Sequence, residues 1–249
     1  MILTILVGNT RTRLTWLDHG QVRRRIVLAT EAIVRHGTWA EVTNDAVRMT
    51  KGVAMASVVP KATRGWCRLL HQAGVRPLVV GPRTRTGLVF RYRRAQLGAD
   101  RVCLAVGAHS RFRDDLIVLD FGTAITVNVV TRKGEFLGGA ILPGLRLMLA
   151  ALARGTAIPW PMPNIRLVPR TVLGHGTAGA IRSGVSFLLA GGISHIIERI
   201  RKETQREYRV VATGGDAGWF CRHLNVIRTV DQDLAARGLA RLFYINRRS

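Results

Sequence analysis

A carboxylate followed by a glycine–threonine turn is the first feature of this sequence that could do chemistry. The apolar run Leu116–Leu119 predicts a buried strand that ends at Asp120. Gly122 and Thr123 then form a tight turn before an alternating strand. Glycine lets backbone approach a ligand closely, successive N–H groups can surround phosphate oxygens, and a carboxylate can hold a cation. The pattern predicts a phosphate and cation site, and an ordinary strand meander is the alternative.

The same order of strand, glycine turn and strand occurs at the start of the chain. Its strands and turns are predicted at residues 3–7, 8–10, 13–17, 18–20 and 21–29. An internal repeat of this kind indicates two similar domains with a ligand between them. The first copy differs at one position, because Leu6 stands where the second copy has Asp120.

A second carboxylate, Asp100, lies at the start of a helix predicted to run from Leu97 to about Phe112. As an isolated acid it would be an N-terminal helix cap. The functional alternative is a general base held on a rigid element. The adjacent Arg101 could bind a substrate carboxylate or phosphate in a bidentate manner.

Strands and helices alternate along the rest of the chain, which predicts an α/β fold. Further strands are predicted at residues 52–59, 76–80, 209–212 and 225–230, and a basic loop at 81–94. Helices are predicted at 31–49 (with Trp39 and Val42 on the apolar face), 60–73 before Gly74, 145–153, 177–204, from 219, and 233–244. The proline-rich segment 157–169 is predicted to be an extended lid or connector, and 246–249 a frayed end. The long, glycine-punctuated helix 177–204 is either a core helix or a dimer contact.

Composition limits the class of protein. The 249 residues, 47% of them hydrophobic, suffice for one large domain or two small ones. We expect a cytoplasmic protein, since we find neither a signal-like N-terminus nor an apolar window of about 18 residues. Three scattered cysteines and seven scattered histidines predict free thiols and no zinc site. The net charge of +23 permits nucleic-acid binding, but the arginines are dispersed, and anionic substrates use such charge equally well.

Taken in order, the short motifs resemble those of the type III pantothenate kinase family, within the superfamily of acetate kinases, sugar kinases, heat-shock chaperones and actin. The motifs are 8–10, 97–101, 120–124, 137–139 with 143–145, 174–177 and 212–215, and the resemblance covers residues 3 to about 244. It implies two ribonuclease H-like domains of duplicated topology, 1–112 and 113–249, with an interdomain cleft and a long dimerisation helix in the second. It also implies a homodimer that phosphorylates pantothenate with ATP, using K⁺ or NH₄⁺ besides Mg²⁺ with the nucleotide.

The resemblance also implies roles for individual residues. Asp100 would be the proton acceptor, and Asp120 would bind the monovalent cation. Pantothenate would contact Tyr92 (one residue nearer to Asp100 than is common), Gly98, Ala99, Asp100, Arg101 and Thr177. The first nucleotide loop would comprise Leu6, Val7, Gly8, Asn9, Thr10, Arg11, Thr12 and Arg13, and Thr123 would also contact ATP.

Two positions depart from the family pattern. The first motif of the family carries Asp where this chain has Leu6, and a second acid is usual at Asn128. Leucine cannot help to hold a metal–nucleotide complex. Three hypotheses follow: an active, slow pantothenate kinase, a catalytically dead relative that acts as a regulatory or transcriptional accessory protein, or a different small-molecule kinase.

Overall fold

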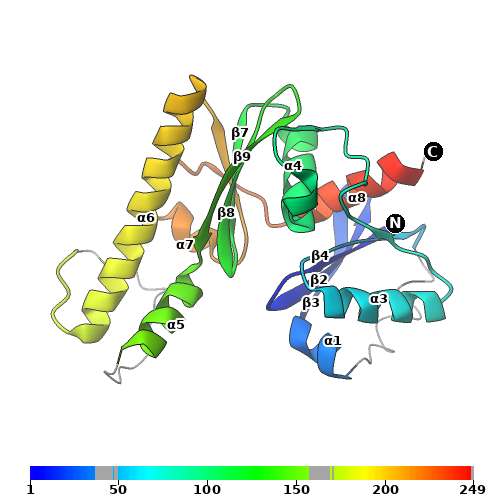
Figure 1. Cartoon of the computed structure of the whole chain (residues 1–249), viewed down its shortest axis with the longest axis horizontal. Coiled ribbons are helices and arrows are strands. Elements are labelled where there is room, and N and C mark those ends of the chain that lie inside the picture. The colour runs from blue at the N-terminus through cyan, green and yellow to red at the C-terminus, as the bar shows by residue number, and fades with distance from the viewer. Residues whose placement is uncertain (37–46, 48–49, 157–168, 170, 248–249) are drawn as a thin grey trace. The chain divides into compact units, whose positions relative to one another are not determined.

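The computed structural model describes residues 1–36, 47, 50–156, 169 and 171–247, and these form two compact units (Figure 1). Unit 1 comprises Met1–Asp114, Asn128–Gly138 and Asp233–Ser249. Unit 2 comprises Asp115–Val127 and Gly139–Gln232. The predicted domains, 1–112 and 113–249, are continuous segments. The two units are not, because residues 128–138 and 233–249 belong to unit 1.

Unit 1 is built on a five-stranded sheet of order β3-β2-β1-β4-β5. Its strands are β1 Ile2–Val7, β2 Arg11–Asp18, β3 Gln21–Ala29, β4 Val53–Ser57 and β5 Leu78–Val79. The first three strands are antiparallel, and β4 and β5 continue the sheet in parallel. Its helices are α1 Thr30–His36, α3 Pro60–Gln72, α4 Ala99–Phe112 and α8 Leu234–Arg247, with a 3₁₀ turn at Arg94–Gln96.

Both faces of the unit 1 sheet are covered, so β1 is apolar on both sides. Leu3 and Ile5 pack in one cluster with Trp66 of α3. Ile2 and Leu6 belong to the opposite cluster, which contains residues of α4 and α8. This alternation is what strand geometry dictates, and it places Leu6 on the α4–α8 side.

Helices α4 and α8 cross at two glycines. A Cβ built on Gly107 would collide with the carbonyl oxygen of Leu234 and lie 3.1 Å from the Gly238 nitrogen. A Cβ on Gly238 would likewise collide with the Cys103 carbonyl oxygen. The glycines therefore let the two backbones approach closely, which ties the end of the chain to unit 1.

Replacing Gly107 by alanine should test this crossing. We expect Gly107→Ala to lower the free energy of unfolding by about 2 kcal/mol, the usual cost of overpacking, in a urea titration. Gly65→Ala in α3 is the matched control, because its Cβ would meet only Ile33 at an ordinary 3.7 Å. Equal stabilities of the two variants would contradict the close crossing.

Unit 2 holds most of a six-stranded sheet of order β11-β10-β7-β8-β9-β6. The strands are β6 Val89–Phe90, β7 Leu116–Phe121, β8 Ala124–Val130, β9 Glu135–Pro143, β10 Arg209–Thr213 and β11 Thr229–Val230. β6 and the hairpin end 128–138 are counted with unit 1. The helices of unit 2 are α5 Leu145–Gly155, α6 Thr177–Thr204 and α7 Ala217–Cys221. Strand order 9-8-7-10-11 repeats the order 3-2-1-4-5, which confirms the predicted duplication.

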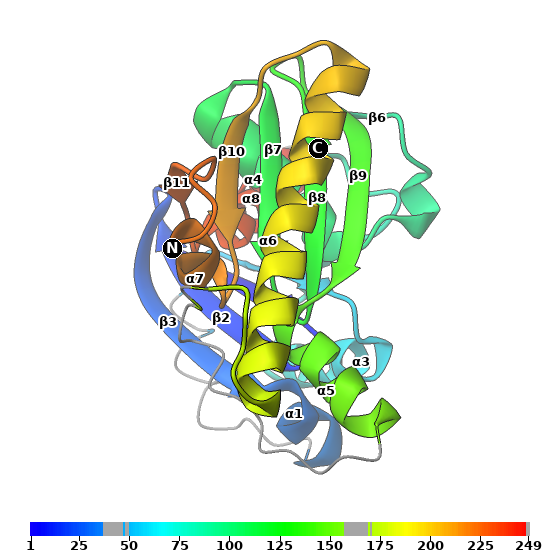
Figure 2. The ribbon, with the colours of Figure 1, turned by 90° about the vertical axis from the view of Figure 1, so that its left-hand side faces the viewer.

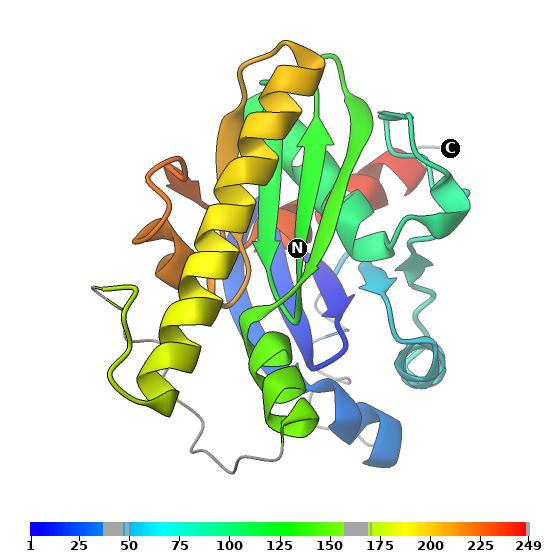
Figure 3. The same cartoon turned by 60° about the vertical axis from the view of Figure 1, so that its left-hand side comes forward.

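The long helix α6 runs across one face of this sheet (Figures 2 and 3). By length and composition alone it could cross a membrane, contrary to the sequence analysis. However, Val185, Leu189, Ile193 and Ile197 form a buried seam along it. Core helices pass the same test, so a single such helix is weak evidence for a membrane span.

Most predicted elements are confirmed, with limited corrections. The predicted strands 76–80 and 225–230 are wrong in length, since only Leu78–Val79 and Thr229–Val230 are strands. The last helix continues to Arg247, so a frayed end from 246 is wrong. The predicted helix 31–49 is confirmed to His36. Trp39, Val42 and the connector at 157–168 lie outside the described residues.

The three cysteines are free, as expected. Burial raises the pKa of the thiols of Cys67, Cys103 and Cys221. A raised pKa keeps a thiol protonated near neutral pH, where only the thiolate is a good nucleophile. Cys103 lies in the cluster with α4 and α8, and Cys67 packs against the cluster on the opposite face.

Candidate functional site

The first glycine loop is a rigid turn between β1 and β2. The Gly8 N–H donates to the Arg11 carbonyl at 3.0 Å. Thr30 then binds the loop twice: its hydroxyl donates to the Gly8 carbonyl at 2.7 Å, and its N–H donates to the Thr10 carbonyl at 3.0 Å. Asn9, Thr10 and Arg11 remain exposed. A turn fixed in this way, with exposed polar groups at its tip, suits a phosphate ligand. Thr30 was not predicted as a site residue.

Leu6, in the family's carboxylate position, is a packing residue in this structure. It lies half-buried against Leu17 and the α8 residues Ala236 and Ala240. Its partner across the antiparallel β1–β2 pair is Arg13. No three His, Cys, Asp or Glu side chains gather among the described residues. The residues present therefore do not fit a divalent ion held by the protein at this loop.

The start of α4 places Asp100 in the first helical turn. The residue at the cap is Gly98, which corrects the prediction that Asp100 sits at that position. Asp100 Oδ1 accepts a hydrogen bond of 2.8 Å from the Arg101 N–H. Because the side chain is only half-buried, part of the carboxylate surface is open to a ligand.

Gly98 leaves room for this carboxylate, since a Cβ at position 98 would collide with Asp100 Oδ1. We expect Gly98→Ala to displace the carboxylate. If Asp100 is the proton acceptor that the resemblance implies, kcat should fall about tenfold, because small misplacements of catalytic groups are costly. The fold should tolerate the change, because the atom that must move is the end of a side chain. Steady-state kinetics with a thermal melt will check this, and an unchanged kcat would show that the position of Asp100 does not limit turnover.

Arg101 is buried within unit 1, where its side chain contacts one amide and two aromatic rings. Its side chain is 5% exposed, and its Nε donates to Asn128 Oδ1 at 2.6 Å. The guanidinium carbon lies 5.4 Å from the ring centre of Tyr92 and 5.5 Å from that of Phe136. The structure thus brings Tyr92 to the guanidinium of Arg101, the residue that follows Asp100 in the chain. Asn128 and Phe136 are additional members that the sequence did not assign to substrate binding.

The loop that carries Tyr92 is fixed by Arg94. Its Nη2 donates to the carbonyls of Gly81 at 3.2 Å and Thr84 at 3.3 Å. The guanidinium also stacks on Phe90, 4.3 Å from the ring centre. Burial lowers the pKa of Arg94, although arginine remains charged at neutral pH. The arrangement stabilises the loop in front of α4.

In unit 2 the second glycine turn is enclosed by two other glycines. Gly144 donates its N–H to the Thr123 carbonyl at 2.9 Å, and its Cβ position would collide with the carbonyl oxygens of Gly122 and Thr123. Gly214 has φ +95°, and a Cβ there would lie 2.5 Å from Asp120 Oδ1. Only glycine fits at both positions. The Asp120 carboxylate therefore lies beside the Gly214 turn, next to the backbone of Phe121.

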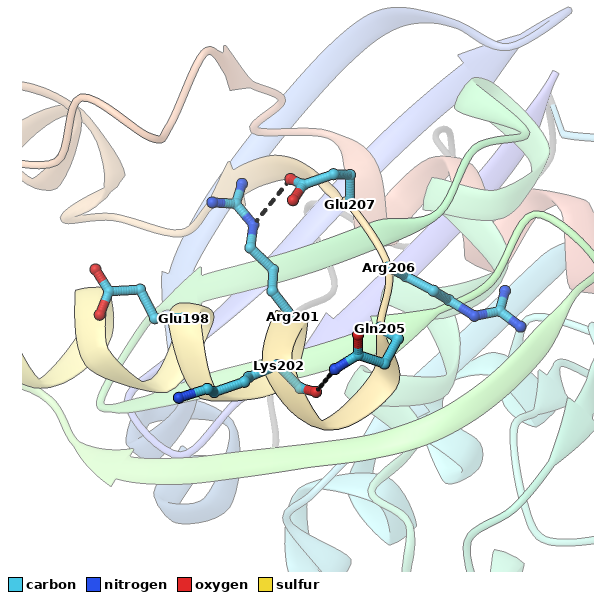
Figure 4. Close-up of a pocket in the computed structure, with 6 residues that line it drawn as sticks. All are labelled: Glu198, Arg201, Lys202, Gln205, Arg206 and Glu207. Atoms are coloured by element: carbon cyan, nitrogen blue, oxygen red, sulfur yellow. Dashed lines mark hydrogen bonds and ion pairs between the residues drawn. The ribbon is translucent and has the colours of Figure 1, made fainter.

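Thr177 is the exposed first residue of α6. The segment before it is bound to the helix, because Ser183 Oγ donates to the Val172 carbonyl at 2.5 Å. Asp120, Thr123 and Thr177 belong to unit 2, whereas residues 6–13 and the Asp100 group belong to unit 1. A separate surface hollow at the end of α6 contains no predicted site residue (Figure 4). It is lined by Glu198, Arg201, Lys202, Gln205, Arg206 and Glu207.

Two units of repeated strand order, each with a glycine turn after its first strand, define a duplicated ribonuclease H-like fold. Solved structures agree on the fold. A protein described as a Baf family transcriptional activator from Campylobacter jejuni matches with TM-score 0.64 and 18% identity, covering 99% of this chain and 100% of that one. A protein described as a 2-dehydro-3-deoxygalactonokinase from Sinorhizobium meliloti matches with TM-score 0.62 and 16% identity, covering 99% of each chain.

The model of the type III pantothenate kinase family matches residues 2–199. A type III pantothenate kinase from Geobacter sulfurreducens is 33% identical, over 99% of this chain and 100% of its own length. One from Rhodospirillum rubrum is 37% identical, over 96% of each chain. The chain therefore belongs to the type III pantothenate kinase family, as the resemblance predicted.

Proposed function

We propose that this protein transfers the γ-phosphoryl group of ATP to the primary hydroxyl of pantothenate and forms 4′-phosphopantothenate, the first step of coenzyme A synthesis. Membership of the family over nearly the whole chain carries this proposal. The grouping of Asp100, Arg101 and Tyr92 at the start of α4 supports it, because these residue types suit an anionic alcohol as substrate.

On the substrate side, Asp100 orients the hydroxyl and accepts its proton late in phosphoryl transfer. Arg101 binds the substrate carboxylate, with Tyr92 beside it. Gly98 and Ala99 shape the backbone at the helix start, and Thr177 binds pantothenate from the start of α6. Phosphoryl transfer requires positioning and charge stabilisation more than covalent help, and these side chains supply both.

On the nucleotide side, the loop 6–13 and Thr123 bind the phosphates of ATP, and Asp120 binds K⁺ or NH₄⁺. A Mg²⁺ ion would travel with the nucleotide, because Mg²⁺ is commonly held by phosphate oxygens and water. The Leu6 side chain offers no oxygen to this ion.

We propose a homodimer formed through α6, located in the cytoplasm. Phe187 is 42% exposed and Leu188 62% exposed on this helix, away from its buried seam, so a second copy could cover them. Light scattering of the purified protein at several concentrations will measure the mass. A monomer at all concentrations would contradict this part of the proposal.

The regulatory alternative rests on the net charge of +23. Binding to DNA or RNA across a salt titration tests it. If the affinity is the same for all nucleic-acid sequences and is lost by physiological salt, the positive charge causes only nonspecific binding.

A substrate panel tests the kinase proposal against a different kinase on the same fold. ADP release should require pantothenate and should not be stimulated by sugars or other primary alcohols. Release stimulated by another alcohol and not by pantothenate would contradict the proposed substrate. The assay needs a high enzyme concentration, because Leu6 in place of an acid predicts slow turnover. It should contain either K⁺ or NH₄⁺.

A further inference from the structure

We propose that Thr30 is a positioning residue for the first glycine loop. Its hydroxyl orients the Gly8–Asn9 peptide so that the Asn9 N–H faces a phosphate group of ATP. This inference rests on the proposed function, because that function supplies the nucleotide for the loop 6–13. Thr30 itself lies outside the loop, as the first residue of α1.

Two buried hydroxyls and one carbonyl form a hydrogen-bonded chain whose direction is fixed. Thr30 Oγ1 lies 2.7 Å from the Gly8 carbonyl oxygen and 3.0 Å from Thr12 Oγ1. A hydroxyl has one proton and a carbonyl oxygen only accepts, so Thr30 donates to Gly8 and the Thr12 hydroxyl donates to Thr30. Thr12 and Thr30 are 0% and 2% exposed, which shields both bonds from water. The Gly8 carbonyl is therefore held by a hydroxyl that is itself fixed by Thr12.

Peptide geometry transmits this orientation to the tip of the loop. The peptide bonds of the described residues are all trans, so the Gly8 carbonyl and the Asn9 N–H point in opposite directions. The carbonyl points at the buried Thr30, and Asn9 is exposed. The N–H of Asn9 therefore points away from the interior. An oriented backbone N–H at a glycine turn is the kind of donor that binds phosphate oxygens.

The backbone of Thr30 holds the loop independently of the hydroxyl. Its N–H donates to the Thr10 carbonyl at 3.0 Å, and the Gly8 N–H closes the turn on the Arg11 carbonyl at 3.0 Å. Both bonds survive a change of the side chain at position 30. Loss of the hydroxyl should therefore leave the turn closed and free the Gly8–Asn9 peptide to rotate. The side chain thus sets the direction of one donor, whereas the turn itself depends on the backbone.

Thr30→Val is the direct test, because valine has nearly the same shape as threonine and lacks the hydroxyl. Calorimetry with Mg²⁺ and K⁺ present should compare the binding of pantothenate with that of an ATP analogue whose γ-phosphate cannot be transferred. We expect the variant to bind the ATP analogue about tenfold more weakly, the effect of one impaired hydrogen bond to a charged group, and pantothenate within about twofold of the wild type. Thr30→Ser keeps the hydroxyl and should bind the ATP analogue within about threefold of the wild type.

Thr4→Val is the matched control. Thr4 is 0% exposed on β1, and its hydroxyl donates to the Thr15 carbonyl at 3.0 Å, so the change removes a comparable buried bond within the sheet and not at the loop. This control should keep the ATP affinity of the wild type, and melting temperatures check the folding of all variants. Unchanged ATP affinity in Thr30→Val, equal weakening for ATP and pantothenate, equal weakening in Thr4→Val, or no rescue by Thr30→Ser would overturn the inference.

If Thr30→Val does not fold, Thr30→Ala replaces it. The smaller side chain admits a water molecule to the Thr12 hydroxyl and the Gly8 carbonyl, which satisfies them without fixing the peptide, so the ATP analogue should bind at least about threefold more weakly. Unchanged affinity in that variant would also overturn the inference. Wild-type protein that binds the ATP analogue and forms no product would contradict the proposed function alone, whereas wild-type protein that binds no ATP analogue would overturn both.

Discussion

Asp100→Asn should lower kcat by about a thousandfold, within the range that general-base catalysis contributes. Asparagine keeps an acceptor oxygen for the Arg101 N–H, so the start of α4 should persist. The substituted side chain has almost the same volume but cannot accept the proton of the pantothenate hydroxyl. Steady-state kinetics will measure kcat, and calorimetry should find ADP affinity unchanged.

Asp18→Asn is the matched control for this prediction. Asp18 lies in the same unit and forms partly exposed ion pairs, 3.5 Å from the N-terminal amine and 3.9 Å from Arg23. Pairs of this kind contribute less than about 1 kcal/mol, so the control should be fully active. Full activity of Asp100→Asn would reduce Asp100 to a residue that stabilises the start of α4.

Leu6→Asp should raise kcat/KM about a hundredfold, because one preorganised charged group contributes about 3 kcal/mol to a transition state. The same change should reduce stability by about 1–2 kcal/mol, since Leu6 packs against Leu17 and Ala236. Arg13, directly across the β1–β2 pair, will offset part of the cost of a partly buried carboxylate. Kinetics at varied Mg²⁺ and a urea titration measure the two effects.

Leu6→Asn separates charge from packing. It removes the same apolar contacts and has almost the same volume as the aspartate variant, but it adds no negative charge. We expect it to lose stability without gaining activity. Equal activities of the two variants would mean that a carboxylate at position 6 has no role in this protein.

Strands and turns were predictable where the local pattern is strong. Apolar runs that end at glycine turns correctly predicted β1, β7 and the turns that follow them. The short strands β5 and β11 were overestimated, because their length is set by parallel pairing with β4 and β10 rather than by their own residues. Such pairing is not visible in a local sequence window.

The end of α8, and the unit to which this helix belongs, depend on contacts with residues far away in the sequence. α8 extends past the predicted end partly because Asn246 exchanges hydrogen bonds with the backbone of Arg85, 161 residues away. α8 joins unit 1 because Gly238 meets Gly107. Neither contact leaves a signal in the sequence near α8. For this reason the predicted domain boundary between residues 112 and 113 did not assign α8 to unit 1.

The candidate site was predictable only as separate motifs. The motif order selected Asp100, Arg101 and Tyr92, and the structure brings Tyr92 to the guanidinium of Arg101, next to Asp100 in the chain. The partnership of Arg101 with Asn128 was not predictable, because 27 residues separate them and the sequence shows Asn128 only as one residue of a strand. A missing acid at position 128 was the available signal, and it pointed to the metal rather than to Arg101.

The central claim is that this chain phosphorylates pantothenate. The most direct measurement is mass-spectrometric detection of 4′-phosphopantothenate formed by the purified protein from ATP and pantothenate, with K⁺ or NH₄⁺ and Mg²⁺ present. We predict product that accumulates in proportion to enzyme and time, and that falls to background with Asp100→Asn. No product above a no-enzyme control at high enzyme concentration, from protein that is folded and binds ATP, would contradict the claim.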